Sequence, residues 1–219
     1  NDDLEKIKYI DHEDFKACSI NANYEISKGH NGLEKALDII VDKVEKKVDN
    51  NHNIIILSDR KTSKKHAPIP ILLVCSYVHH SLIKRKKRSK FGIVIESAEP
   101  REPHHFSMLF GYGASAINPY MVNEIIEYHH KLGFLNEQKL DKSIDNFNKA
   151  IAKGILKVMN KIGISTLHSY RGAQIFEALG LRQKFVNKYF NNTPSRIEGA
   201  GLYVLEKEVS SLSLIHISE

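Results

Sequence analysis

Two short runs of apolar, largely β-branched residues, Ile54–Leu57 and Phe91–Ile95, constrain the fold of this chain most strongly. Around them lie segments whose apolar residues recur at three- and four-residue steps, the period of an amphipathic helix. A strand without polar alternation is typical of a parallel sheet that is covered on both faces. The alternation of the two kinds of segment therefore predicts an α/β fold with a mainly parallel sheet.

Weaker signals complete this pattern. Further strands are predicted at residues 115–117 and 164–167 and within 17–26. Helices are predicted at residues 31–49, from Pro70 to the basic run, and at 103–111, 121–132, 141–162, 173–179 and 182–190. Three or four such strand–helix units are about half of an eight-stranded barrel, so we expect a partial TIM-like barrel.

The 219 residues are enough for one sizeable domain. The chain does not begin with Met, and we expect it to be part of a longer protein. The longest apolar stretch, Ile69–Tyr77, is too short to cross a bilayer, and the acidic start lacks the core of a signal peptide. Only Cys18 and Cys75 are present, which is typical of a protein of the reducing cytoplasm.

The positive charge comes from one short run of basic residues. Its six cations equal the net charge of +6, so the rest of the chain is electrically balanced. No aromatic residue is interleaved to stack on nucleic-acid bases. We therefore interpret the run as a solvated turn after a helix and expect no nucleic-acid partner. Its members are Lys84, Arg85, Lys86, Lys87, Arg88 and Lys90.

Two motifs suggest ligand sites that their context does not favour. Three His-His pairs occur, but adjacent helical residues point about 100° apart and chelate a metal poorly, so structural roles are expected. The run Gly111–Ala116 fits G-x-G-x-x-A, yet a helix precedes it and a strand follows, the reverse of a dinucleotide site. We expect a helix-to-strand turn there. The pairs are His79-His80, His104-His105 and His129-His130.

Polar residues at the predicted strand ends are the most serious candidates for a site, because active sites of β/α folds form from the loops there. One hypothesis is a free-standing enzyme or anion-binding module that uses Asp59, Glu96 and Arg171. The alternative is that these residues bind neighbouring loops or another domain. The whole set is Asp59, Arg60, Glu96, Asn118, Tyr170 and Arg171.

Several blocks of the sequence resemble the central domain of the glutamate synthase large chain. Their order and spacing match from about residue 15 to residue 209. The longest block runs from Lys153 through Ser169-Tyr170-Arg171-Gly172 to Glu177. The other blocks are Ile56–Arg60, Ala67–Pro70, Glu96-Ser97, Arg101–Phe106, Gly111–Ala114 and Asn118–Tyr120.

This resemblance implies a connecting domain, related to a reduced barrel, between a glutaminase and an FMN-binding barrel with an iron–sulfur cluster. The parent enzyme, an oxidoreductase, converts glutamine and 2-oxoglutarate into two glutamates, in some cases with a small reductase subunit. The family's nucleophilic cysteine, cluster cysteines and FMN segment have no counterpart in this chain. The resemblance thus implies no catalytic, cofactor-binding or metal residue here, and an apolar patch where other domains pack.

We expect three segments along the chain: a lead-in at 1–30, the central α/β domain at 31–209, and a tail at 210–219. The octapeptide Leu212–Glu219 resembles the translation of a sequencing adaptor, so we expect this tail not to be native.

Overall fold

The computed structural model describes residues 2–10, 12–135 and 139–215. Its centre is a sheet of four parallel strands in the order β1-β3-β5-β6. Ile54 pairs with Ala17 on one side and with Gly92 on the other, and Val94 pairs with Ala116. These strands are β1 (Ala17–Asn21), β3 (Ile54–Ser58), β5 (Gly92–Glu96) and β6 (Ala116–Asn118).

Each strand of this sheet is joined to the next by at least one helix. The predicted parallel α/β architecture is confirmed, and the strands follow one another in chain order as in part of a barrel, without closing into one. The helices of the first half are α1 (Asp2–Lys8), α2 (Gly29–Asp49), α3 (Ile71–Lys84) and α4 (Pro103–Gly111).

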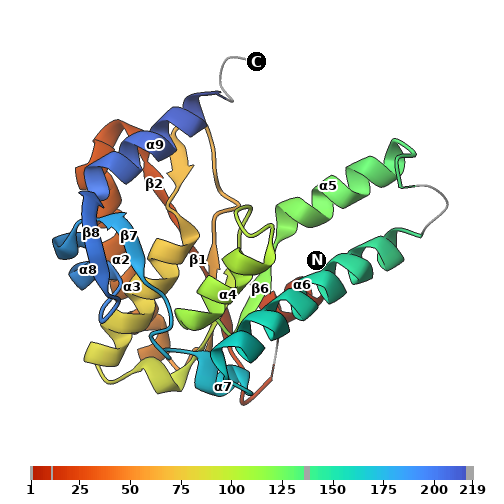
Figure 1. Ribbon diagram of the computed structural model, residues 1–219, viewed down its shortest axis with the longest axis horizontal. Helices are drawn as coiled ribbons and strands as arrows, with labels where there is room; N and C mark the ends of the chain where they lie inside the picture. The colour runs from red at the N-terminus through yellow and green to blue at the C-terminus, as the bar shows by residue number, and fades with distance from the viewer. Residues whose placement is uncertain (1, 11, 136–138, 216–219) are drawn as a thin grey trace.

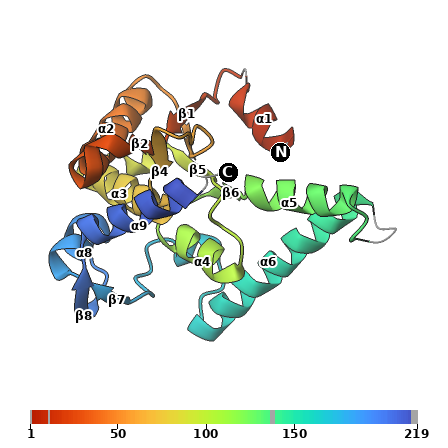
Figure 2. The ribbon, with the colours of Figure 1, turned by 90° about the horizontal axis from the view of Figure 1, so that it is seen from above.

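The two faces of the sheet are covered differently. Ile55 and Ile93 point into the main core with α2 and α3, whereas Ile56 and Val94 contact Leu4 of α1. The apolar stripe predicted for α2 is buried as expected. Figure 2 shows α1 lying apart from α2 and α3. The short helix α1 thus covers the face that would line the interior of a closed barrel.

Two further helices form an arm that projects from the body of the molecule. These are α5 (Tyr120–Lys131) and α6 (Leu140–Ile162). Figure 1 shows both projecting to the same side, and Figure 2 shows that they converge at the tip of the arm. The base of α6 packs on α4, where Gly154 lies so close to Pro103 that a β-carbon would come within 2.5 Å of the proline ring. Gly163 ends α6 with left-handed backbone, as predicted.

Smaller elements complete the fold. A two-stranded antiparallel sheet joins β2 (Asn23–Glu25) to β4 (His66–Pro68), and a parallel one joins β7 (Ala178–Leu181) to β8 (Ser195–Ala200). The remaining elements are helices α7 (Leu167–Tyr170), α8 (Gln183–Tyr189) and α9 (Leu202–Ile215), and the 3-10 turns Ile26–Lys28 and Arg88–Lys90.

Two predicted elements are wrong. Residues 164–167 do not form a strand: the chain leaves α6 irregularly and enters α7, where the Thr166 hydroxyl accepts a hydrogen bond from the Ser169 amide. Residues 173–179 do not form a helix, because Gly172 and Gln174 have positive φ. Ala178–Leu181 instead pairs with β8, a partner that lies too far along the chain to be seen in local periodicity.

The predicted boundaries at residues 30 and 209 remain predictions. Residues 210–215 of the expected tail continue α9, and residues 216–219 lie outside the described residues.

Candidate functional site

The carboxyl ends of β3, β5 and β6 lie at one edge of the sheet. Ser58 pairs with Glu96, and Glu96 with Asn118. Backbone bonds continue past the strands, from the Asp59 amide to the Glu96 carbonyl and from the Ser97 amide to the Asn118 carbonyl. The structure therefore brings the predicted residues Asp59, Glu96 and Asn118 together.

Glu96 is buried and fully engaged in ion pairs. Its Oε1 atom lies 2.9 Å from Lys8 Nζ and 2.9 Å from Arg60 Nε. Burial alone would raise the pKa of Glu96, but hydrogen bonds from Ser58, Lys8 and Arg60 outweigh it and hold the pKa below its usual value. Glu96 thus fastens α1 to the end of the sheet, and its carboxylate is not available as a proton acceptor.

Arg60 is held from three directions. Besides Glu96, it binds Glu124 of α5 at 3.0 Å, and its guanidinium lies 4.0 Å from the centre of the Tyr120 ring. These contacts join β3, β5 and the base of the arm. Arg60 is therefore a positioning residue rather than a free anion site.

Asp59 is also buried, with only 1% of its surface exposed. Its Oδ2 atom accepts hydrogen bonds from the Ser97 hydroxyl at 2.6 Å and the Ala98 amide at 3.1 Å. Its Oδ1 atom has no hydrogen-bond partner among the described residues. Burial raises the pKa of Tyr120, and the neighbouring Asp59 carboxylate raises it further.

A cavity of about 590 Å³ opens beside Asp59. Glu99 lies in the wall of the cavity. Its carboxylate accepts a hydrogen bond of 3.0 Å from the backbone amide of Ile71, which is the first residue of α3. The residue faces solvent in part, yet burial of its carboxyl group raises the pKa of Glu99 to about 7, and the Asp59 charge adds to this. The lining residues include Asp59, Thr62, Lys64, Glu99, Arg101, Tyr120, Met121 and, from α9, Val209, Leu212 and Ser213.

Tyr170 and Arg171 lie elsewhere. The predicted strand that would have placed them at the sheet edge is absent, and the Gly172 amide binds the Gly111 carbonyl at the end of α4. The positive charge of Arg171 lies close enough to His79 and Arg88 to lower the pKa of each. His79 and Gly172 line a smaller cavity of about 170 Å³. The structure thus does not assemble Asp59, Glu96 and Arg171 into one site.

The first His-His pair has structural contacts. His79 accepts a hydrogen bond from Arg88 Nε at 2.9 Å, and burial together with Arg88 and Arg171 lowers the pKa of His79 to about 3. The His80 ring lies 2.9 Å from the Ser76 carbonyl. Residues 104 and 105 belong to α4, and residues 129 and 130 to α5. Within residues 2–10, 12–135 and 139–215, no group of three His, Cys, Asp or Glu could hold a metal ion.

The basic run forms salt bridges to α2 and hydrogen bonds within the fold. Arg85 pairs with Asp42 and Glu45, and Lys87 pairs with Glu45 and Asp49. Arg88 points inward and donates hydrogen bonds to the carbonyls of Phe91 and Gly113. The predicted turn at Gly111 is confirmed, since α4 ends there and β6 follows.

The two thiols do not fit an iron–sulfur cluster. Cysteine ligands must converge as thiolates on one cluster, and the sequence contains only Cys18 in β1 and Cys75 in α3. Burial raises the pKa of Cys75 to about 12 and also raises that of Cys18, so both stay protonated. Nor does the turn at Gly111 open a helix, which a phosphate-binding loop requires.

Sequence reasoning missed Glu99 and the cavity. Glu99 follows β5 by three residues, and its role as a cap of α3 depends on a contact across the sheet edge. The cavity also needs α9, whose residues lie more than 100 positions along the chain from Glu99. No local pattern could have indicated either.

Comparison with known proteins identifies the family. The model of a family described as the glutamate synthase central domain matches residues 1–182. The glutamate synthase [NADPH] large chain of Bacillus subtilis is 38% identical over 95% of this chain and 13% of its own length. The glutamate synthase [NADH] of Schizosaccharomyces pombe is 40% identical over 90% of this chain and 10% of its own length. The ferredoxin-dependent glutamate synthase of Pyropia yezoensis is 34% identical over 91% of this chain and 14% of its own length. The chain therefore spans about an eighth of the length of these relatives.

Proposed function

Because the chain belongs to the family of glutamate synthase central domains, we propose that it is the connecting domain of a glutamate synthase polypeptide. That polypeptide would convert glutamine, 2-oxoglutarate and a reductant into two molecules of L-glutamate in the cytoplasm. A glutaminase domain and an FMN-binding domain with an iron–sulfur cluster would flank this one, and a small reductase subunit would supply electrons in some relatives. This chain would hold none of these cofactors, and none of its residues would be catalytic.

The observation that supports this proposal best is the engagement of the strand-end charges within the fold. Glu96 and Arg60 bind each other, and each also binds another element. In a β/α enzyme, the residues at this edge would instead face an open substrate cleft.

Among the described residues, no helix has the length and apolar character needed to span a bilayer.

A second candidate, a free-standing enzyme or anion-binding module, is favoured by one feature only. The cavity beside Asp59 and Glu99 has the size of a small-molecule site. Arg171, the cation that this hypothesis names, does not line the cavity, although Lys64 and Arg101 do. Thermal unfolding across a panel of phosphates and keto acids distinguishes the two, because a ligand that binds the native state must raise its melting temperature. We expect no shift.

The connecting role is tested in the full-length polypeptide with Asp59→Asn and Glu99→Gln. Loss of a general acid or base costs about 10²–10⁴-fold in rate. We expect glutaminase and glutamate-forming rates each within about threefold of the parent, because neither side chain would take part in either reaction. A hundredfold loss in either rate would reject the non-catalytic assignment.

A further inference from the structure

The projecting helix α5 carries an apolar stripe, which consists of Met121, Ile125, Tyr128 and Leu132. Steps of four, three and four residues place these side chains within a narrow arc on one face of a helix. Ile125, Tyr128 and Leu132 are 42%, 61% and 50% exposed. The described chain thus leaves about two fifths or more of the surface of each of these three residues open to solvent.

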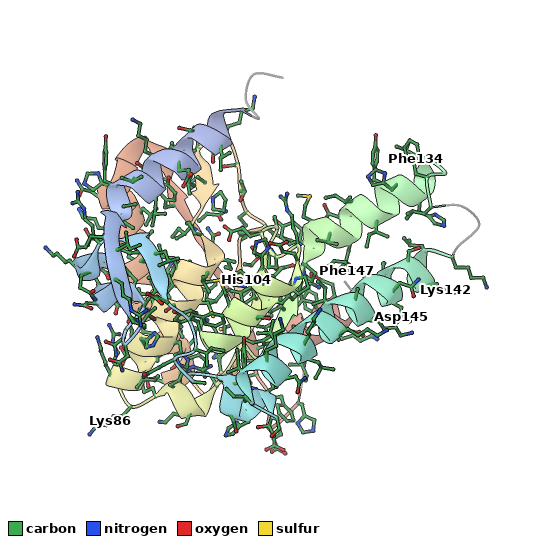
Figure 3. The ribbon with its side chains drawn as sticks, viewed as in Figure 1. Lys86, His104, Phe134, Lys142, Asp145 and Phe147 are labelled. Carbon is green, nitrogen blue, oxygen red and sulfur yellow. The ribbon has the colours of Figure 1, made fainter. Side chains whose placement is uncertain are left out.

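The stripe is distinct from the side of α5 that packs on α6. Val122 and Ile126 are half-buried and lie about 90° and about 130° around the helix from the centre of the stripe. The contact between α5 and α6 therefore leaves the stripe free. Figure 3 shows Phe134, which is 69% exposed and whose ring lies 5.7 Å from that of His129, at the far tip of the arm.

The charges that flank the stripe are already neutralised within the chain. Glu124 pairs with Arg60, and Glu127 pairs with Lys131 at 2.7 Å. A partner for this surface would therefore be recognised by apolar contact, with little contribution from charge. Exposed apolar side chains that lie next to one another and are rimmed by polar residues mark an interaction site, whereas single exposed apolar residues do not.

The stripe is continuous with the cavity at the strand ends. Met121, its first residue, lines that cavity together with Val209 and Leu212 of α9. The last described turns of α9 thus lie beside the start of the stripe. One narrow helix face is small for a free partner, which needs about 800 Å² on each side. A domain tethered in the same polypeptide has an effective concentration in the millimolar range and needs much less.

We propose that the α5 stripe is the surface on which another domain of the same glutamate synthase polypeptide docks, by apolar contact. The relatives extend over seven to ten times the matched length, so such domains are present in their chains. This inference rests on the proposed connecting role and assigns that role to a particular face. The arm would then set the distance between this domain and its neighbour.

Thiol protection in the full-length polypeptide tests the proposal. Leu132→Cys and Tyr128→Cys place a thiol on the stripe, and Lys142→Cys places one at an exposed position of α6, which Figure 3 shows on the other helix of the arm. We expect a maleimide to react at least tenfold more slowly with the two stripe thiols than with the control. Rates that agree within twofold would overturn the proposal.

The protein concentration is then lowered a hundredfold. Protection by a tethered domain does not change on dilution, whereas protection by a second copy of the chain disappears, which would also overturn the proposal. Failure of the connecting role is measured separately by the ratio of glutamine hydrolysed to glutamate formed. If the stripe thiols react as fast as the control while the parent shows a normal ratio of glutamine hydrolysed to glutamate formed, the docking surface is rejected and the connecting role stands.

Discussion

At the scale of single residues, the candidate site contains two acidic groups whose pKa values move in opposite directions. Glu96 has two cationic partners, which keep it charged. For Glu99, which faces solvent in part, burial of the carboxyl group and the nearby Asp59 carboxylate raise the pKa and favour the neutral form. The pKa of the same residue type thus shifts in opposite directions a few residues apart, and the difference lies in the surroundings that the fold supplies.

His79 gives a pH-dependent prediction. Its folded pKa of about 3 lies below the unfolded value of about 6.5, so the unfolded chain binds the extra proton and stability falls as pH decreases from 6.5 towards 3. His79→Gln keeps a hydrogen-bond acceptor for Arg88 but cannot take up a proton. The variant should therefore lose about 2 kcal/mol less free energy of unfolding than the parent between pH 6 and pH 4. Urea unfolding at the two pH values measures this.

The exposed His168 provides the control for this experiment. His168→Gln makes the same chemical change at a side chain that faces solvent, and it controls for the loss of an imidazole as such. An identical loss of stability in the parent and in His79→Gln would show that His79 is not held neutral in the folded state.

At the scale of elements, the close crossing of α4 and α6 fixes the base of the arm. Gly154 has no side chain, and this allows α6 to rest directly on Pro103 at the start of α4. The crossing determines where the arm leaves the body. A glycine, which by its flexibility weakens a helix, is therefore compatible with the close packing at this point.

Substitution of this glycine tests the crossing. Gly154→Ala should destabilise the chain by about 1–3 kcal/mol, because the new β-carbon would lie 2.5 Å from the proline ring. Helix propensity alone predicts the opposite, a gain of about 1 kcal/mol. Chemical denaturation of the parent and of Gly154→Ala decides between these two expectations. The exposed Asn148→Ala on the same helix serves as control and should be neutral or slightly stabilising.

At the scale of the whole molecule, the sheet resembles an open part of a barrel with separate covers on its two faces. The helices α2 and α3 cover one face and α1 the other. The helix α9 packs back over the start of the fold, where Tyr24 donates a hydrogen bond to Glu206 at 3.1 Å. Residues near both ends of the described chain therefore take part in closing the core.

Truncation tests whether residues 212–219, most of the proposed non-native tail, contribute to stability. A chain that ends after Ser211 keeps the Tyr24–Glu206 bond and loses Leu212, which is 59% exposed. Its free energy of unfolding should stay within about 0.5 kcal/mol of the parent. A chain that ends after Gly201 leaves the buried Tyr24 hydroxyl without Glu206 and should lose about 3 kcal/mol or more. A large loss after Ser211 would argue that the tail is structural.

The sequence by itself determined the parallel sheet and most of the local elements around it. Apolar runs such as Ile54–Leu57 predict buried strands, and the stripe of α2 predicts its buried face, because both periods depend only on neighbouring residues. Strand ends that carry Asp59 and Glu96 could likewise be placed at one edge. The family resemblance was also visible in the sequence, and the family match confirms it.

Only the tertiary structure decided which of these polar residues meet. Arg171 was predicted at the same edge, but positive φ values nearby and a pairing of β7 with the distant β8 direct it to the other end of α4. Glu99, the cavity and the free face of α5 likewise depend on contacts between segments far apart in the chain. Such contacts are set by packing and by the entropy of closing long loops, neither of which leaves a local pattern.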